Sequence, residues 1–202
     1  MPRARISKAE RIVIKIGSSS LTLPGGGIDL AHVTALVDVV ANAKAAGKQV
    51  VLVSSGAIAT GFPTLGLATK PRDLATAQAA ASVGQGMLFS TYSQLFAARG
   101  ITVGQILLTA DDMNRRSHYR NAQQTMFRLL ELGVVPIVNE NDTVATAEIR
   151  LGDNDRLAAL VAHLVDAKAL VLLSDVDGLY DKSPSEPDAK LIAEAVSYTH
   201  LT

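Results

Sequence analysis

Two clusters of carboxylate and carboxamide side chains stand out in the sequence, one at residues 139–142 and one at residues 153–155. The first reads Asn-Glu-Asn-Asp and follows an apolar run, and the second reads Asp-Asn-Asp and precedes an apolar segment of helical period. Together these groups suit a small ligand with both an ammonium and a carboxylate, such as an amino acid. Asp153 could instead be an ordinary helix N-cap, and Asn and Asp are common in turns. That interpretation does not explain residues 139–142, which lie where a strand should end, the usual place for a ligand in an open α/β sheet.

A lysine lies on an otherwise apolar run near the N-terminus. Residues 11–16 form a β-branched run that predicts a buried strand, with Lys15 one residue before its end and Gly-Ser-Ser-Ser directly after it. A lysine at a strand edge could simply reach solvent. In a central strand, however, an unpaired buried lysine would be costly. We therefore favour a cation at the carboxyl end of the strand, beside a turn whose backbone N–H groups could bind phosphate.

Small polar residues also follow other apolar runs. Ser54-Ser55-Gly56 comes after the run at 49–53, and Ser174-Asp175 comes after the run at 169–173. The backbone amides at Ser54-Ser55-Gly56 could face an anion, but small residues could equally serve only to make a tight turn. We expect these turns to lie with residues 139–142 along one edge of a sheet.

Strand-like and helical patterns alternate along the chain, which predicts an α/β fold with a mostly parallel sheet and helices on both faces. Residues 109–120 are polar and are expected to be irregular or partly helical. Expected strands cover residues 11–16, 49–53, 101–108, 134–138 and 169–173, and expected helices cover 29–46, 74–99, 122–132 and 156–165. Within the long helix, Gly84 and Gly86 lower helix stability, so they predict a very close neighbour: a subunit interface, or packing within the domain.

Composition excludes several classes of function. The chain has 19 Lys+Arg and 19 Asp+Glu, so its formal net charge is zero, whereas a protein that binds nucleic acid through phosphates is usually basic. It has no cysteine, so we expect no disulfide, thiolate zinc site or cysteine nucleophile. Its four histidines lack metal-ligand spacing and are expected to be structural or surface residues. No Walker A motif or G-x-S-x-G is present. With no membrane-length apolar run and no signal-peptide h-region, a cytoplasmic protein is expected.

Six segments together resemble the amino acid kinase family, and within it the branch that phosphorylates glutamate. The Lys-x-Gly-Ser and Asp-x-x-Gly-Leu-Tyr motifs occur in several branches, whereas Asn-Glu-Asn-Asp-Thr-Val combined with Gly-Asp-Asn-Asp is specific to the glutamate branch. The resemblance runs from about Arg11 to about Ile192, through residues 11–20, 51–58, 105–109, 136–144, 152–155 and 173–180.

This resemblance implies a three-layer αβα sandwich on a mainly parallel sheet. It also implies transfer of the γ-phosphoryl group of ATP, with Mg²⁺, to the side-chain carboxylate of L-glutamate, giving glutamyl 5-phosphate, the first intermediate of proline biosynthesis. Because that carboxylate is already ionised at pH 7, no general base is needed, and catalysis would be mostly charge neutralisation and positioning.

Matching positions imply the following roles, with no residue implied as a metal ligand. Lys15 would contact the transferring phosphoryl group, and Asp155 would orient the lysine. Glutamate would be bound by Ser55, Asn139, Asp142 and Asn154, and the nucleotide by Lys15, Gly17, Ser18, Ser174 and Asp175.

The chain also departs from the family pattern. The Gly-rich segment with a second catalytic lysine has no match, nor does the small C-terminal RNA-binding-like domain of many members. Residues 196–202 do not resemble the family. We therefore expect an incomplete kinase domain at residues 1–195 and a non-native tail at 196–202. The protein of this length should be poorly active, with an exposed sheet edge and exposed apolar surface.

Alternatives stay open at this point. The chain could be another family member, such as an aspartate or acetylglutamate kinase, or a non-catalytic amino-acid sensor. An NAD-binding module is disfavoured because the complete glycine fingerprint is missing. If the glutamate branch is right, proline is a possible feedback inhibitor and a homo-oligomer is expected.

Overall fold

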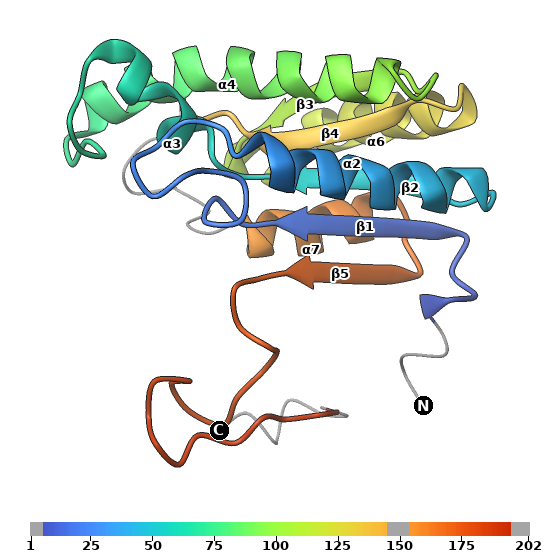
Figure 1. The fold of residues 1–202 in the computed structure, drawn as a ribbon. Coiled ribbons are helices and arrows are strands. Elements are labelled where there is room, and N and C mark those ends of the chain that lie inside the picture. Colours follow the sequence, from blue (N-terminus) through green and yellow to red (C-terminus); the bar gives the residue numbers. More distant parts are fainter. Residues whose placement is uncertain (1–5, 145–153, 195–202) are drawn as a thin grey trace.

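A five-stranded parallel sheet forms the centre of the computed structural model, which describes residues 6–144 and 154–194 (Figure 1). The strand order is β3-β4-β2-β1-β5, so β1 pairs with β2 on one side and β5 on the other. The strands are β1 (Arg11–Ile16), β2 (Gln49–Ser54), β3 (Val103–Leu108), β4 (Val135–Glu140) and β5 (Ala169–Leu173). All four pairings are parallel, so the five carboxyl ends lie along one edge.

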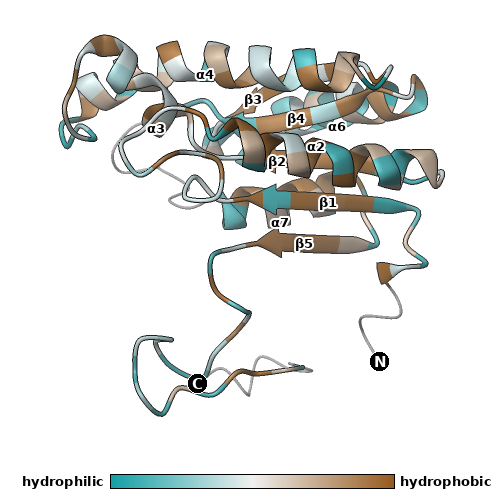
Figure 2. Ribbon diagram, in the orientation of Figure 1, coloured by the Kyte–Doolittle hydropathy of each residue, from teal (hydrophilic) through white to brown (hydrophobic). Residues whose placement is uncertain are grey.

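Helices cover both faces of this sheet. One apolar core lies between the sheet and α2 (Leu30–Ala45) with α4 (Leu74–Ala97), and a second lies between the sheet and α6 (Arg116–Glu131) with α7 (Asp155–Leu164). The strands are predominantly hydrophobic (Figure 2). The predicted three-layer αβα arrangement is therefore confirmed. The shorter elements are α3 (Ala57–Gly61), the 3₁₀ helix η1 (Pro63–Leu65) and α5 (Ala110–Asn114).

Alternation along β1 sets the direction of Lys15. Ile12, Ile14 and Ile16 belong to the core beneath α2 and α4, whereas Val13 belongs to the core beneath α6 and α7. Because successive side chains of a strand point to opposite faces, Lys15 shares the face of Val13 and is directed toward α7.

Several expected boundaries were wrong. Strand β4 continues through Asn139 and Glu140 because these residues pair with Leu107 and Leu108 of β3, so they end the strand instead of following it. The segment 109–120 is more helical than expected, since it contains α5 and the first turns of α6. The N-cap position of α7 is Asn154, whereas Asp153, the expected cap, and the predicted tail at 196–202 lie outside the described residues.

The close contact expected at the glycines of α4 is present at only one of them. A Cβ atom on Gly84 would lie 1.9 Å from the carbonyl oxygen of Ala57 in α3, and one on Gly61 would lie 2.0 Å from the carbonyl oxygen of Ala80. A Cβ atom on Gly86 would meet nothing within 4 Å. Gly84 therefore serves the packing of α3 on α4 within this chain.

The β5 side of the sheet is more exposed than its centre. β5 is an edge strand within the described part of the chain, and the side chain of Leu172 is 48% exposed.

Candidate active site

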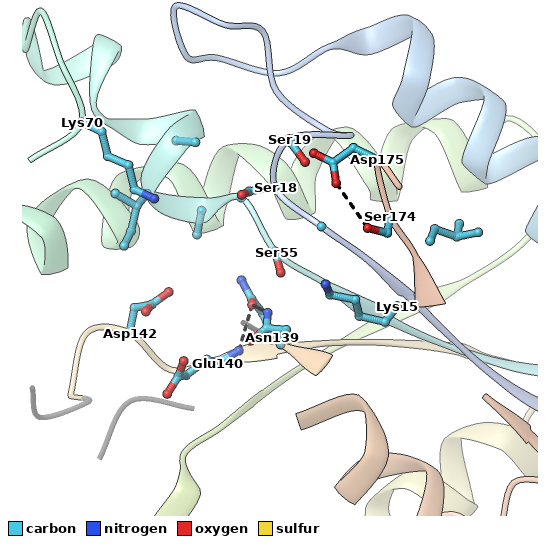
Figure 3. A pocket seen from close by; sticks show the side chains of 17 residues that line it. Lys15, Ser18, Ser19, Ser55, Lys70, Asn139, Glu140, Asp142, Ser174 and Asp175 are labelled. Carbon is cyan, nitrogen blue, oxygen red and sulfur yellow. Dashed lines mark hydrogen bonds between the residues drawn. The ribbon is translucent and has the colours of Figure 1, made fainter. Parts of the chain in front are cut away.

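A cavity of about 320 Å³ lies at the carboxyl edge of the sheet (Figure 3). Its walls come from the ends of β1, β2, β4 and β5 and from the turns that follow them. Chain segments far apart in sequence therefore meet here, as expected for the strand ends of a parallel sheet. The site residues predicted from sequence that line it are Lys15, Gly17, Ser18, Ser55, Asn139, Asp142, Asn154, Ser174 and Asp175.

The remaining predicted residue, Asp155, contacts one of these. Its Oδ1 atom lies 2.6 Å from Nζ of Lys15, whose side chain is only 4% exposed, while that of Asp155 is 49% exposed. Asp155 is the first residue of α7, where the helix dipole favours a negative charge. The ion pair thus connects the buried end of β1 to the start of α7 and places an ammonium group at the cavity.

The turn after β1 brings backbone close to the same ammonium. A Cβ atom on Gly17 would lie 3.7 Å from Nζ of Lys15. The carbonyl oxygen of Ser18 accepts bonds from the backbone N–H groups of Leu21 and Thr22 at 3.0 and 3.1 Å, which fixes the turn. An anion bound against this turn would therefore also lie beside Lys15.

A second turn is anchored to the first. The backbone N–H of Ser55 donates to the carbonyl oxygen of Ile16 at 3.2 Å, which joins the end of β2 to the end of β1. Gly56 follows with φ +99°, a left-handed conformation that favours glycine, and it is the N-cap of α3. This glycine lets the chain turn sharply, so that Ser55 and the start of α3 both line the cavity.

Two buried asparagines form the floor of the site, where Asn154 Nδ2 donates to Asn139 Oδ1 at 2.7 Å and to the carbonyl oxygen of Ser54 at 2.8 Å. Asn139 Oδ1 also accepts from the backbone N–H of Glu140 at 2.9 Å. Both amide protons of Asn154 are thus committed to the protein, so its amide can offer a ligand only the oxygen, an acceptor. Asn139 can still offer a ligand one N–H, because its amide carries two protons and, among the described residues, only one is used, in a bond to Gln85.

The same network reaches into the core through Ser54. Ser54 Oγ and the Tyr92 hydroxyl are 3.1 Å apart, and both side chains are buried. Burial raises the pKa of the Tyr92 phenol well above its ordinary value, and the hydrogen bond to Ser54 offsets only part of that rise. Tyr92 therefore stays neutral and serves the network as a hydroxyl group.

Sequence analysis did not assign two charged residues that line this cavity. Glu140 is 6% exposed and belonged to the polar cluster at 139–142, so a signal for it was present. Lys70 extends toward the cavity from the loop before α4 (Figure 3). That loop carries no motif, so nothing local in the sequence marked Lys70.

Comparison with known proteins identifies the family. The sequence profile described as "Amino acid kinase family" matches residues 10–201. The chain belongs to the amino acid kinase family. Three relatives, all named glutamate 5-kinase, are 63% identical to it in Streptomyces coelicolor, 62% in Thermobifida fusca and 59% in Frankia casuarinae.

These matches cover nearly all of this chain but only part of each relative. They include 95%, 95% and 98% of this chain, and 51%, 50% and 53% of the three relatives in the same order. The chain thus spans about half the length of the curated relatives it matches.

The cavity offers several of the chemical groups that phosphoryl transfer to an amino acid would need. A kinase must hold two anions in line, so it needs positive charge and backbone N–H groups at the point of transfer. Lys15 and the turn at Gly17 meet there, and amide and carboxylate groups that could hold an amino acid lie alongside.

No group of three or more His, Asp or Glu side chains in residues 6–144 and 154–194 is placed to hold a metal ion. Within these same ranges, no helix has the length and apolar character needed to cross a membrane.

Proposed function

We propose that the protein is a glutamate 5-kinase, which transfers the γ-phosphoryl group of ATP to the side-chain carboxylate of L-glutamate in the first step of proline biosynthesis. The observation that carries this proposal is the meeting, in one cavity, of Lys15 and its neighbouring turn with Asn139, Asp142 and Asn154. The name of the relatives, at 59–63% identity, supports the same activity.

The proposed reaction needs no proton transfer by the protein. An oxygen of the glutamate side-chain carboxylate attacks the γ-phosphorus, a new O–P bond forms, and the bond to the bridging oxygen of ADP breaks. The acceptor is ionised at pH 7 and ADP leaves as an anion, so charge neutralisation and alignment supply the catalysis. Lys15 would provide a buried ammonium for the transferring group, and Asp155 would hold that ammonium in place.

Recognition of the amino acid would follow from the committed hydrogen bonds of the floor. Because Asn154 can offer only an acceptor, it suits the α-ammonium of glutamate, together with the carboxylate of Asp142. The remaining N–H of Asn139 and the hydroxyl of Ser55 suit carboxylate oxygens. Lys70 would add positive charge on the acceptor side.

The nucleotide would lie on the side of Gly17, Ser18, Ser174 and Asp175, all of which line the cavity. Mg²⁺ would arrive bound to ATP, since this ion keeps several waters and is commonly held by phosphates and only one or two carboxylates. Asp175 is a carboxylate in a suitable position, and its Oδ1 accepts from Ser174 Oγ at 3.2 Å.

A cytoplasmic location is proposed from the biosynthetic role and the absence of cysteine. Feedback inhibition by proline and assembly into a homo-oligomer are further proposals, and both rest on the family resemblance alone.

A hydroxamate assay tests the activity. Protein expressed from its complete gene would be supplied with MgATP, L-glutamate and hydroxylamine, which traps an acyl phosphate as a coloured hydroxamate. Aspartate and N-acetylglutamate would run in parallel. Hydroxamate from glutamate alone, lost in a Lys15→Ala variant, is the expected result. Glutamate binding without hydroxamate from any acceptor would favour a sensor, and product from aspartate or N-acetylglutamate would favour the corresponding kinase.

A further inference from the structure

Gln85 extends the asparagine network of the cavity floor from a helix that does not itself end at the site. Its Oε1 atom accepts from Asn139 Nδ2 at 2.6 Å, although Gln85 lies near the middle of α4. Gln85 is absent from the lining of the cavity at the carboxyl edge of the sheet, whereas Asn139 and Asn154 both line it. Gln85 is therefore one residue removed from any ligand in that cavity.

The direction of every bond in this network is fixed by backbone groups at its ends. The Glu140 N–H can only donate, so the group of Asn139 that faces it must be the oxygen. The Ser54 carbonyl can only accept, so the group of Asn154 that faces it must be the nitrogen. Asn139 must then present its nitrogen to Gln85, and Gln85 must answer with its oxygen.

The helix position of Gln85 explains how it reaches the sheet. Leu88, Tyr92 and Phe96 lie on the same face of α4, three, seven and eleven residues further on, and all are buried against the sheet. Gln85 continues this stripe toward the N-terminal end of α4, level with the carboxyl end of β4. Gly84 allows α4 to approach α3 closely, and this contact helps to hold α4, and with it Gln85, in position.

We infer that Gln85 is a positioning residue for glutamate: it holds the Asn139 amide in the one orientation that lets Asn139 accept from Asn154 and leaves the Asn154 oxygen to receive the substrate ammonium. This inference rests on the proposed function and adds a residue that supports its glutamate-binding side. Without a hydrogen-bond acceptor at position 85, the Asn139 amide loses its partner on one side and can tilt. Its bond from Asn154 is then weakened, although the Ser54 carbonyl still sets the direction of the Asn154 amide. Glutamate affinity should fall, while the nucleotide side, formed by other residues, should be unaffected.

The test compares four variants of the protein expressed from its complete gene. Gln85→Met keeps the length of the side chain but removes the acceptor, and Gln85→Asn keeps an amide that is too short to reach Asn139. Gln85→Glu keeps an accepting oxygen at the original length. Gln94→Met is the matched control, because Gln94 is exposed on the same helix and, within the described residues, its side chain bonds only Ser90 Oγ, at 3.3 Å.

Gln85→Met and Gln85→Asn should raise the KM for glutamate about five- to tenfold, within the range for one lost hydrogen bond, with the KM for ATP unchanged. Gln85→Glu should recover most of the glutamate affinity, and Gln94→Met should match wild type. An unchanged KM for glutamate in the first two variants, or an equal rise in both KM values, would overturn the inference. A failure of Gln85→Met to fold leaves Gln85→Asn to decide.

Calorimetric titration with glutamate separates this inference from the proposed function. If wild type binds glutamate but makes no hydroxamate, the kinase proposal fails, and the Kd values of the variants still decide the role of Gln85. If wild type is active and the variants bind glutamate normally, only the role of Gln85 is overturned. If wild type neither binds nor phosphorylates glutamate, both are overturned.

Discussion

The amino group of Lys15 lies 2.6 Å from Oδ1 of Asp155, so the buried end of β1 and the first residue of α7 form one ion pair at the cavity. The two partners differ in exposure, since the lysine is almost wholly buried while the aspartate is about half exposed. This difference in exposure gives the two groups different roles. The buried ammonium offers its charge to a ligand, and the aspartate fixes its position without competing fully for it, because solvent weakens the attraction.

Replacing Lys15 by methionine should abolish phosphoryl transfer with little loss of stability. Removal of one group that stabilises transition-state charge commonly lowers kcat about 100-fold or more. The loss of stability should stay at about 1 kcal/mol, because the substitution removes the buried charge and leaves the half-exposed carboxylate of Asp155 in contact with solvent. Hydroxamate kinetics and thermal unfolding would be measured together. If the folded variant kept more than about a tenth of the wild-type kcat, Lys15 would not act at the transferring group.

Asp155→Asn should lower kcat less than Lys15→Met, and its effect should depend on Lys15. The Lys15–Asp155 pair is intermediate between exposed and buried ion pairs, so breaking it should lower the free energy of unfolding by about 1–3 kcal/mol. In a Lys15→Met background the same substitution should change kcat little, because Asp155 would act through the lysine. Additive losses in the double variant would show that Asp155 acts independently of Lys15.

Lys70→Met should raise the KM for glutamate about two- to fivefold, a modest effect because the charge is exposed and screened. The effect should shrink as salt is added. Arg72→Met is the matched control, since Arg72 is an exposed cation two residues away that does not line the cavity. Equal changes in both variants would mean that only the general charge of this loop matters.

The strand-end part of the site could be predicted from sequence because apolar runs mark where strands end. Lys15, Ser55 and Ser174 each lie at or just after such a run, and a parallel sheet brings these ends together. The end of β4 was placed two residues early. Asn139 and Glu140 are polar, which normally indicates a loop, yet the pairing partners in β3 extend the ladder through both.

Other features depend on contacts between distant segments that no local pattern encodes. Gln85 lies 54 positions before Asn139, its hydrogen-bond partner, on a helix whose sequence gives no sign of a ligand site. Lys70 extends toward the cavity from the loop before α4, and nothing in the sequence of that loop places it beside the strand ends. The early start of α6 was missed for a related reason, since only Met126 and Leu130 of that helix are buried and its first turns are polar.

Asp112→Asn should lower stability near neutral pH by about 1 kcal/mol, the usual cost of a lost capping interaction. Asp112 Oδ2 accepts from the backbone N–H of Thr109 at 2.8 Å and completes the capping box of α5, and Oδ1 lies 2.7 Å from His118 Nδ1. Burial alone would raise the pKa of Asp112, but the hydrogen bonds from His118 and Thr109 outweigh it and hold the pKa below its ordinary value of 3.8.

The sign of the pH dependence follows from this lowered pKa. The carboxylate stabilises the folded state above the unfolded-state pKa, and this contribution is lost as the pH falls through the folded-state pKa. The difference between wild type and Asp112→Asn in chemical denaturation should therefore shrink below about pH 4. Asp111→Asn is the control, since its side chain pairs with the exposed Arg115 and should have little effect. A stability difference that persisted at low pH would mean that asparagine at position 112 destabilises the protein for a reason other than the lost charge.

Gly84→Ala should destabilise the protein by about 3 kcal/mol or more, although alanine is the better helix former. The new Cβ atom would lie 1.9 Å from the Ala57 carbonyl oxygen and 2.6 Å from the Gly61 nitrogen. Both contacts are to backbone, so relief requires α3 to move away from α4. Ala57 also lines the cavity, and glutamate affinity should therefore fall together with stability.

Gly86→Ala is the matched control for this substitution, on the same helix and two residues away. A Cβ atom there meets nothing within 4 Å, so the gain in helix propensity should stabilise the protein by about 0.5–1 kcal/mol. Chemical denaturation of the two variants should give changes of opposite sign, and only Gly84→Ala should weaken glutamate binding. If Gly84→Ala were as stable as wild type, α3 could separate from α4 at little cost. The cavity wall formed by α3 would then be adjustable, because its contact with α4 would not fix its position.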